Sequence, residues 1–218
     1  MENGIHEGTV KRFSTEQFGQ FKDGVLGMFE QAKRFERYRK GAKRGYAQAQ
    51  LYLGWCYAKG EGARQDYTKA VRWFRMAAEQ GDARAQLNLG NCYARGLGIQ
   101  QDYHEAAVWF VRVTEQGLAE AQNNIGALYM TGQGVHRDYA QGLSWFHAAA
   151  KQGLLRAIYN LFLCYSKGIG VRQDDNEAHR WTRKALEVAK KDRPQLHASV
   201  AQLRSGSIEN PAVPKHPL

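Results

Sequence analysis

A period of 36 residues runs through most of this 218-residue chain and restricts what it can fold into. The segment AQAQLYLGWCY at 47–57 returns as ARAQLNLGNCY at 83–93 and as AEAQNNIGALY at 119–129. Positions 36 residues apart are equivalent, and each set of equivalent positions is called a column. Two columns hold glycine at four successive positions and one holds tryptophan: Gly60, Gly96, Gly132, Gly168; Gly45, Gly81, Gly117, Gly153; and Trp73, Trp109, Trp145, Trp181. The period predicts four stacked repeats, at 47–82, 83–118, 119–154 and 155–190.

Each repeat is predicted to form two helices joined by glycine turns. Ala49, Leu53 and Cys56 fall on one face of a first helix, here called helix A, over about residues 47–58. Gly60 and Gly62 then end it, because glycine accepts the left-handed conformation that follows a helix. A second helix, helix B, begins after an aspartate at its N-cap in every repeat: Asp66, Asp102, Asp138 and Asp174.

Helix A also carries a glycine in its interior, at Gly54, Gly90 and Gly126. Such a glycine costs about 1 kcal/mol relative to alanine, so its recurrence predicts that another helix approaches closely there. Phe162 breaks this rule in the fourth repeat.

The pattern A-x-A-x-x-x-L-G-x-x-Y-x-x-G-x-G-x-x-x-D-x-x-x-A-x-x-W-x-x-x-A-x-x-Q-G resembles the Sel-one-like repeat family, a relative of tetratricopeptide repeats. The resemblance implies an all-α, right-handed superhelix of four helix–turn–helix repeats. Gly24 and Gly45 fall on the glycine columns, so residues 1–46 are expected to hold an N-terminal segment and a degenerate capping repeat (11–46). We expect a capping helix at 191–204 and a disordered tail at 205–218.

Composition excludes a transmembrane protein, and the distribution of charge differs from that of a typical nucleic-acid binder. Formal net charge is +10, but residues 47–154 carry 10 basic and 9 acidic groups, so the excess lies at the two ends. A nucleic-acid binder normally shows a basic stripe along its contact surface. No apolar run is long enough to cross a bilayer, which takes roughly 18 to 20 residues. Without a signal peptide in this sequence the default compartment is the cytoplasm, or the periplasm if a signal segment precedes it.

No motif predicts catalysis, a cofactor or a metal site. The 7 histidines form no HxxxH or HExxH pair, and no phosphate-binding loop is present. Cys56, Cys92 and Cys164 share a column with Leu128, which indicates buried, unpaired thiols. We therefore expect a non-enzymatic protein without cofactors, and we favour a monomer.

Positions that vary between repeats are candidates for binding. The second, sixth, ninth and thirteenth positions of helix A vary and lie on one helical stripe, which we call the A-face stripe. The family resemblance implies that the A helices line the concave face of the superhelix. The predicted partner-binding residues are Tyr52, Trp55, Lys59, Arg84, Asn88, Asn91, Arg95, Glu120, Asn124, Arg156 and Asn160.

Two features of the stripe leave alternatives open. Trp55 occupies a column that otherwise holds asparagine, alanine and leucine, so it is either a binding anchor or packed beneath the N-terminal repeat. Asn88, Asn124 and Asn160 form a ladder in the sequence. Their amides could hold an extended peptide of a partner or bond from neighbour to neighbour.

A basic end face is predicted between residues 33 and 44, where 7 of 12 residues are basic and 1 is acidic. Its residues are Lys33, Arg34, Arg37, Arg39, Lys40, Lys43 and Arg44, with Phe35 and Tyr38 beneath. It is either a solvated cap or a site that steers an acidic partner or anionic lipid.

The resemblance implies a protein-binding adaptor, because members of the family act in signalling, envelope assembly and protein quality control, and some are immunity proteins that block secreted lipase-type toxins. We expect a partner protein in the concave groove, with a bacterial immunity protein against such a toxin as the specific hypothesis. The alternatives are a scaffold or adaptor, and an anionic membrane or nucleic acid bound at the basic ends.

Overall fold

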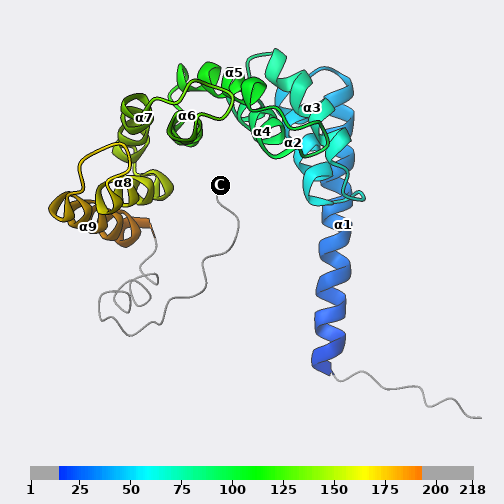
Figure 1. Ribbon diagram of the computed structural model, residues 1–218. Helices are drawn as coiled ribbons and strands as arrows, with labels where there is room; N and C mark the ends of the chain where they lie inside the picture. Colours follow the sequence, from blue (N-terminus) through cyan, green and yellow to red (C-terminus); the bar gives the residue numbers. More distant parts are fainter. Residues whose placement is uncertain (1–14, 193–218) are drawn as a thin grey trace, which may run out of the picture. The chain divides into compact units, whose positions relative to one another are not determined.

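The computed structural model describes residues 15–192, and within them every regular element is an α-helix (Figure 1). The elements are α1 (Thr15–Lys43), α2 (Ala47–Lys59), α3 (Tyr67–Glu79), α4 (Ala83–Arg95), α5 (Tyr103–Thr114), α6 (Ala119–Thr131), α7 (Tyr139–Lys151), α8 (Leu155–Lys167) and α9 (Asp175–Asp192). The all-α prediction is confirmed. The predicted capping helix, beyond its first two residues, and the predicted tail lie outside the described residues.

The chain divides into two compact units, which are described separately. The first runs to Asp82 and contains α1, α2 and α3, and the second begins at Ala83 and contains α4 to α9. The A helices of the four repeats are α2, α4, α6 and α8, and the B helices are α3, α5, α7 and α9. No helix in the described part of the chain is long and apolar enough to cross a membrane.

The helix ends form as the sequence predicts. The Asp66 carboxylate accepts a hydrogen bond from the Lys69 amide at 2.9 Å, and Asp138 accepts one from the Gln141 amide at 3.0 Å. These contacts satisfy amides that an isolated helix N-terminus leaves unpaired. At the other end of α2, Gly60 has a φ of 77° and donates its amide to the Cys56 carbonyl.

The glycine inside each of the first three A helices makes room for a phenylalanine of the B helix. A Cβ atom placed on Gly90 would lie 2.6 Å from Cε1 of Phe110, and one on Gly54 would lie 2.6 Å from Cδ1 of Phe74. The predicted close approach is therefore confirmed. In the fourth repeat the two sizes are exchanged, because Phe162 stands in the glycine column and Thr182 in the phenylalanine column.

A pair of glutamines, buried on the A helix and exposed at the end of the B helix, joins the two helices of each of the first three repeats. The side-chain amide at the end of the B helix donates to the amide oxygen on the A helix, in the pairs Gln80 to Gln50 (2.7 Å), Gln116 to Gln86 (3.1 Å) and Gln152 to Gln122 (2.9 Å). In the fourth repeat both columns become apolar together, as Ile158 and Val188, which belong to one hydrophobic cluster.

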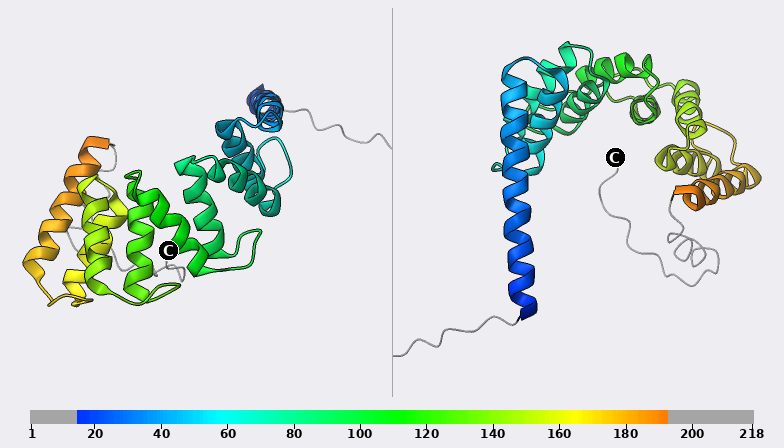
Figure 2. Two further views of the ribbon diagram at one scale, coloured as in Figure 1. Left: turned by 90° about the horizontal axis from the view of Figure 1, so that it is seen from above. Right: turned by 180° about the vertical axis from the view of Figure 1, so that it is seen from behind.

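The N-terminal region differs from the expected degenerate repeat. Residues 15–43 form one continuous helix of 29 residues without a turn at Gly24. Its C-terminal part takes the place of a B helix: Phe35 and Ala42 are buried in a cluster with Leu53 of α2. Its N-terminal part extends beyond α2 and α3, as two views from opposite sides show (Figures 1 and 2).

The three cysteines are buried and unpaired, as predicted. Burial raises the pKa of the Cys92 thiol to about 11, and that of Cys164 to about 11 as well. A thiol with such a pKa is protonated at neutral pH, so it behaves as a small apolar core residue.

Candidate functional site: the A-face stripe

In the second unit, the A-face stripe is exposed at both ends of each A helix and half-buried or buried in the middle. The exposed ends carry Arg84 and Arg95 on α4, Glu120 and Thr131 on α6, and Arg156 and Lys167 on α8. The middle positions are more enclosed: Asn88, Asn91, Asn124 and Asn160 are partly buried, and Ala127 is buried. The predicted residues therefore form polar and charged ends around a sheltered amide centre.

The asparagines bond to one another, but not in the predicted ladder. Asn124 donates to the Asn91 side-chain oxygen at 2.8 Å, and Asn160 donates to that of Asn123 at 2.9 Å. Asn88 instead donates to the Arg84 carbonyl of its own helix at 2.8 Å. The sixth position of one A helix therefore bonds the ninth position of the preceding one between α4 and α6, and the fifth position between α6 and α8, but in neither case the sixth.

Sequence reasoning missed Asn123, which completes this amide chain. Asn123 is 4% exposed and donates to the Asn124 side-chain oxygen at 3.4 Å, so the amides of α4, α6 and α8 form one hydrogen-bonded chain. A signal was present in the sequence, because the column of Asn123 otherwise holds Leu51, Leu87 and Tyr159. A polar residue in an apolar column requires a partner.

In the first unit, the stripe carries a row of stacked aromatic rings, which we call the aromatic anchor: Tyr38, Tyr52 and Trp55. The Tyr52 ring stacks on Tyr38 of α1, with centroids 5.0 Å apart and planes 24° apart. Trp55 meets Tyr52 edge to face at 5.8 Å, and the Lys59 ammonium lies 5.9 Å from the Trp55 ring. Trp55 is half-buried, so it is fixed through Tyr52 against α1 and keeps an exposed edge.

The basic end face is exposed along its whole length. All seven predicted residues, Lys33, Arg34, Arg37, Arg39, Lys40, Lys43 and Arg44, are exposed, while Phe35 is buried and Tyr38 half-buried as predicted. Two of the cations are paired within the helix, Lys33 with Glu30 at 3.2 Å and Arg39 with Glu36 at 2.7 Å. Exposed pairs of this kind contribute little to stability and leave the positive field in place.

The described residues contain no group of three or more histidine, cysteine, aspartate or glutamate side chains able to hold a metal ion. The His147 ring packs 5.2 Å from Trp181, and partial desolvation there lowers the pKa of His147. Tyr165 lies 3.5 Å from its Nε2 atom. What the stripe offers chemically is amide hydrogen bonding, charge and aromatic surface, which are the means of binding a protein.

Comparison with known proteins agrees with this reading. The Sel1 repeat family model matches residues 47–82, 83–118, 119–154 and 155–187. Among solved structures, a protective antigen of uropathogenic Escherichia coli strains, c5321, which displays an SLR fold, is 35% identical with a TM-score of 0.66. The match covers 80% of this chain but only 37% of that one.

A Sel1 repeat protein from Oxalobacter formigenes is 28% identical with a TM-score of 0.67, and the match covers 81% of this chain and 80% of that one. Comparison with curated proteins gives no match. Sel1 repeats mediate the binding of protein partners and are typically non-catalytic. The four matched repeats cover more than half of the sequence, and the chain therefore belongs to the Sel1 repeat family.

Proposed function

We propose that this protein binds a partner protein through the A-face stripe, with the aromatic anchor as the main point of attachment. The observation that carries the proposal is Trp55. The equivalent positions of the other repeats hold Asn91, Ala127 and Leu163, so the repeat fold does not require an indole there. A large aromatic ring at a position free to vary is best explained by binding.

The geometry of the aromatic anchor suits this role. Tyr38 and Tyr52 hold the Trp55 ring by stacking and edge-to-face contact before any partner arrives. Binding residues that are already ordered lose little conformational entropy in the complex. Tryptophan and tyrosine are also the residue types that most often dominate the energy of protein interfaces.

The charges of the second unit indicate the kind of partner surface. Exposed stripe ends carry four cations, Arg84, Arg95, Arg156 and Lys167, and one anion, Glu120. A partner with an acidic contact surface is therefore favoured, and it would associate faster at low ionic strength. The hydrogen-bonded amide chain between these ends supplies a fixed polar centre.

Affinity capture from the native organism, followed by mass spectrometry, identifies the partner. A secreted lipase-type hydrolase would make the protein an immunity protein that covers a catalytic cleft. A signalling or envelope protein would make it a scaffold. Both outcomes keep the proposed binding surface.

The binding surface is tested by titration calorimetry with the captured partner. Trp55→Asn copies the residue of the second repeat, so folding should be retained, and affinity should fall by about 1–3 kcal/mol, roughly 5- to 150-fold. Met76→Ala is the matched control, because Met76 is 44% exposed on α3 of the same unit. Equal affinities for Trp55→Asn and wild type would refute the proposal.

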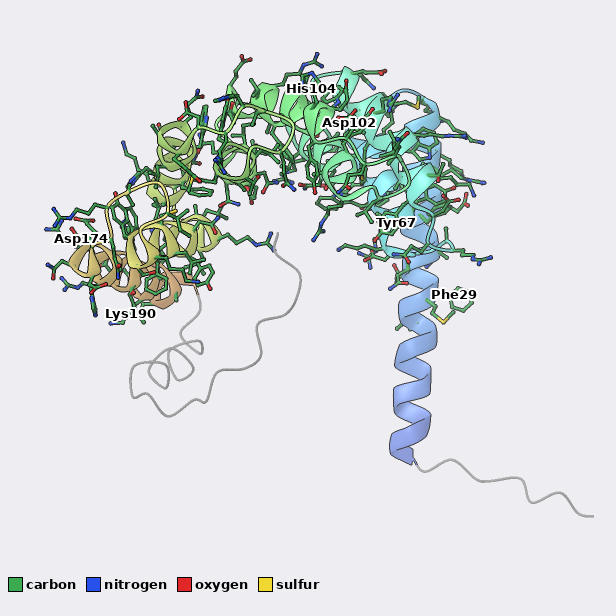
Figure 3. All side chains as sticks on the ribbon, in the orientation of Figure 1. Phe29, Tyr67, Asp102, His104, Asp174 and Lys190 are labelled. Carbon is green, nitrogen blue, oxygen red and sulfur yellow. The ribbon has the colours of Figure 1, made fainter. Side chains whose placement is uncertain are left out.

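A second candidate function, membrane-surface binding, rests on the exposed part of α1. Leu26, Met28 and Phe29 are 59%, 70% and 63% exposed, and Phe29 stands on the stretch of α1 that α2 and α3 leave uncovered (Figure 3). Apolar side chains next to a cationic run are typical of helices that lie on anionic membranes. Co-sedimentation with phosphatidylserine vesicles, but not with phosphatidylcholine vesicles, would support it, and Phe29→Ser should then abolish the binding.

A further inference from the structure

An open pocket of about 750 Å³ lies in the second unit, on the B helices rather than on the A-face stripe. Its apolar lining includes Val108 and Val111 of α5, Tyr129 of α6 and Val135 of the following loop; we call it the valine pocket. Its polar lining includes His104, Arg112 and His136.

The two valines are not needed by the repeat fold. The column of Val108 holds Arg72, Ser144 and Arg180, and the column of Val111 holds Arg75, His147 and Arg183. Every other repeat therefore has a polar or charged side chain where the second repeat has valine. Val111 is 40% exposed, so this apolar surface faces solvent.

The equivalent place in the next repeat is filled by an aromatic ring, that of His147, which is itself exposed. There His147 takes the position of Val111, and its ring packs against Trp181 at 5.2 Å and Tyr165 at 6.4 Å. Valine is shorter than histidine and carries no ring, which leaves the pocket open between α5 and the start of α7. Exposed apolar surface rimmed by polar groups marks binding sites on soluble proteins.

The polar rim favours negative charge. The Arg112 guanidinium lies 4.7 Å from the Trp109 ring, which orders it. His104 donates a hydrogen bond from Nδ1 to the Gly134 carbonyl at 3.3 Å. His104 stands beside Asp102 at the start of α5 (Figure 3). The one carboxylate in the lining, Asp138, caps α7 through the Gln141 amide and also bonds the Gln141 side chain.

We propose that the valine pocket is a second protein-docking site, which binds a segment carrying an aliphatic or aromatic side chain next to aspartate or glutamate. The apolar side chain fills the space over Val108 and Val111, and the carboxylate pairs with Arg112. This site is separate from the A-face stripe, so the protein can hold two different partners at the same time.

The probe is a phage-displayed library of random 12-residue peptides, selected on the full chain and counter-selected on Val108→Arg/Val111→Arg. Both substitutions copy the arginines found in the first and fourth repeats, so the double variant should keep the wild-type circular dichroism. Enriched peptides should combine a leucine, phenylalanine or tryptophan with neighbouring acidic residues. Their dissociation constants, measured by fluorescence polarisation, should rise at least 10-fold with the double variant and with Arg112→Glu.

Three results would overturn the proposal. Peptides that bind wild type and the double variant equally would show that the pocket is not their site. Peptides lost with Trp55→Asn but kept by the double variant would belong to the A-face stripe. Self-association of the wild type that the double variant abolishes, seen by sedimentation equilibrium, would assign the pocket to a second copy of this chain. If the double variant is less helical, Val111→His, which copies the third repeat, takes its place.

Discussion

The glutamine pair of the third repeat gives a quantitative test of how the repeats are held together. Gln152 donates through Nε2 to the Gln122 side-chain oxygen at 2.9 Å and to the Gly117 carbonyl at 2.9 Å. Gln122 is 8% exposed, whereas Gln152 is exposed. The fourth repeat supplies the apolar alternative, since Ile158 and Val188 occupy the same two columns.

The single substitutions should lower the free energy of unfolding, whereas the double substitution should leave it almost unchanged. Gln152→Val removes both hydrogen bonds and leaves the buried Gln122 oxygen without this donor, which should cost about 2–3 kcal/mol. Gln122→Ile should cost about 1 kcal/mol or less, because Gln152 keeps the Gly117 bond and is open to water. In the double variant neither polar group remains, so its stability should lie within about 0.5 kcal/mol of wild type.

The assay is urea unfolding followed by circular dichroism at 222 nm for wild type, both single variants and the double variant. The cycle should give a coupling free energy of about 2–4 kcal/mol. A double variant destabilised by the sum of the two single effects, within about 0.5 kcal/mol, would refute the reasoning. In that case the glutamines would act independently, and the joint change in the fourth repeat would need another explanation.

Three further predictions concern packing and protonation. Gly90→Ala should lower the free energy of unfolding, measured in urea, by about 1–2 kcal/mol, because overpacking against the buried Phe110 ring outweighs the gain in helix propensity. Gly27→Ala is the control: a Cβ atom there meets nothing within 4 Å, so this variant should be as stable as wild type or more stable. A stable Gly90→Ala and a destabilised Gly27→Ala would contradict this. Hydrogen bonds from Gln141 hold the pKa of Asp138 below its ordinary value of 3.8. The ionised carboxylate therefore stabilises the fold fully above pH 3.8, and this stabilisation is lost as the pH falls through the lowered pKa. The difference in melting temperature between wild type and Asp138→Asn should accordingly shrink below pH 3.8. Burial raises the pKa of Cys92 to about 11, so iodoacetamide at pH 8 should label it at least roughly 100-fold more slowly in native than in urea-unfolded protein, whereas equal rates would mean that the thiol is accessible.

Much of the fold could be predicted because the repeats align the sequence with itself. Columns that stay constant report local requirements, such as the aspartate at each N-cap and the glycine beneath each phenylalanine. Gly24 misled this reasoning, because it falls on a glycine column but lies within one continuous helix. An isolated glycine only weakens a helix, and packing of Phe35 and Ala42 secures the C-terminal part of α1.

The candidate site was less predictable, because it depends on how one helix lies against the next. Position in the repeat identified Asn124 and Asn160 as stripe residues but did not reveal that Asn124 pairs with Asn91. The glutamine pairs could be recognised from the sequence only by comparing two columns together. Two columns indicated the valine pocket, because the second repeat has valine where the other repeats have polar residues. That the place stays open depends also on the absence of a ring like that of His147, which only the structure shows.

The central claim, that a partner lies on the A-face stripe, is tested most directly by site-specific photo-cross-linking in cells. The photoreactive residue p-benzoylphenylalanine would be placed singly at Arg84, Glu120 and Arg156 on the stripe, and at Ser144 and Arg183 on the B helices, all exposed positions. The three stripe positions should cross-link to one common protein, and the two B-helix positions should not cross-link to it. Cross-links to that protein from the B-helix positions alone would contradict the central claim.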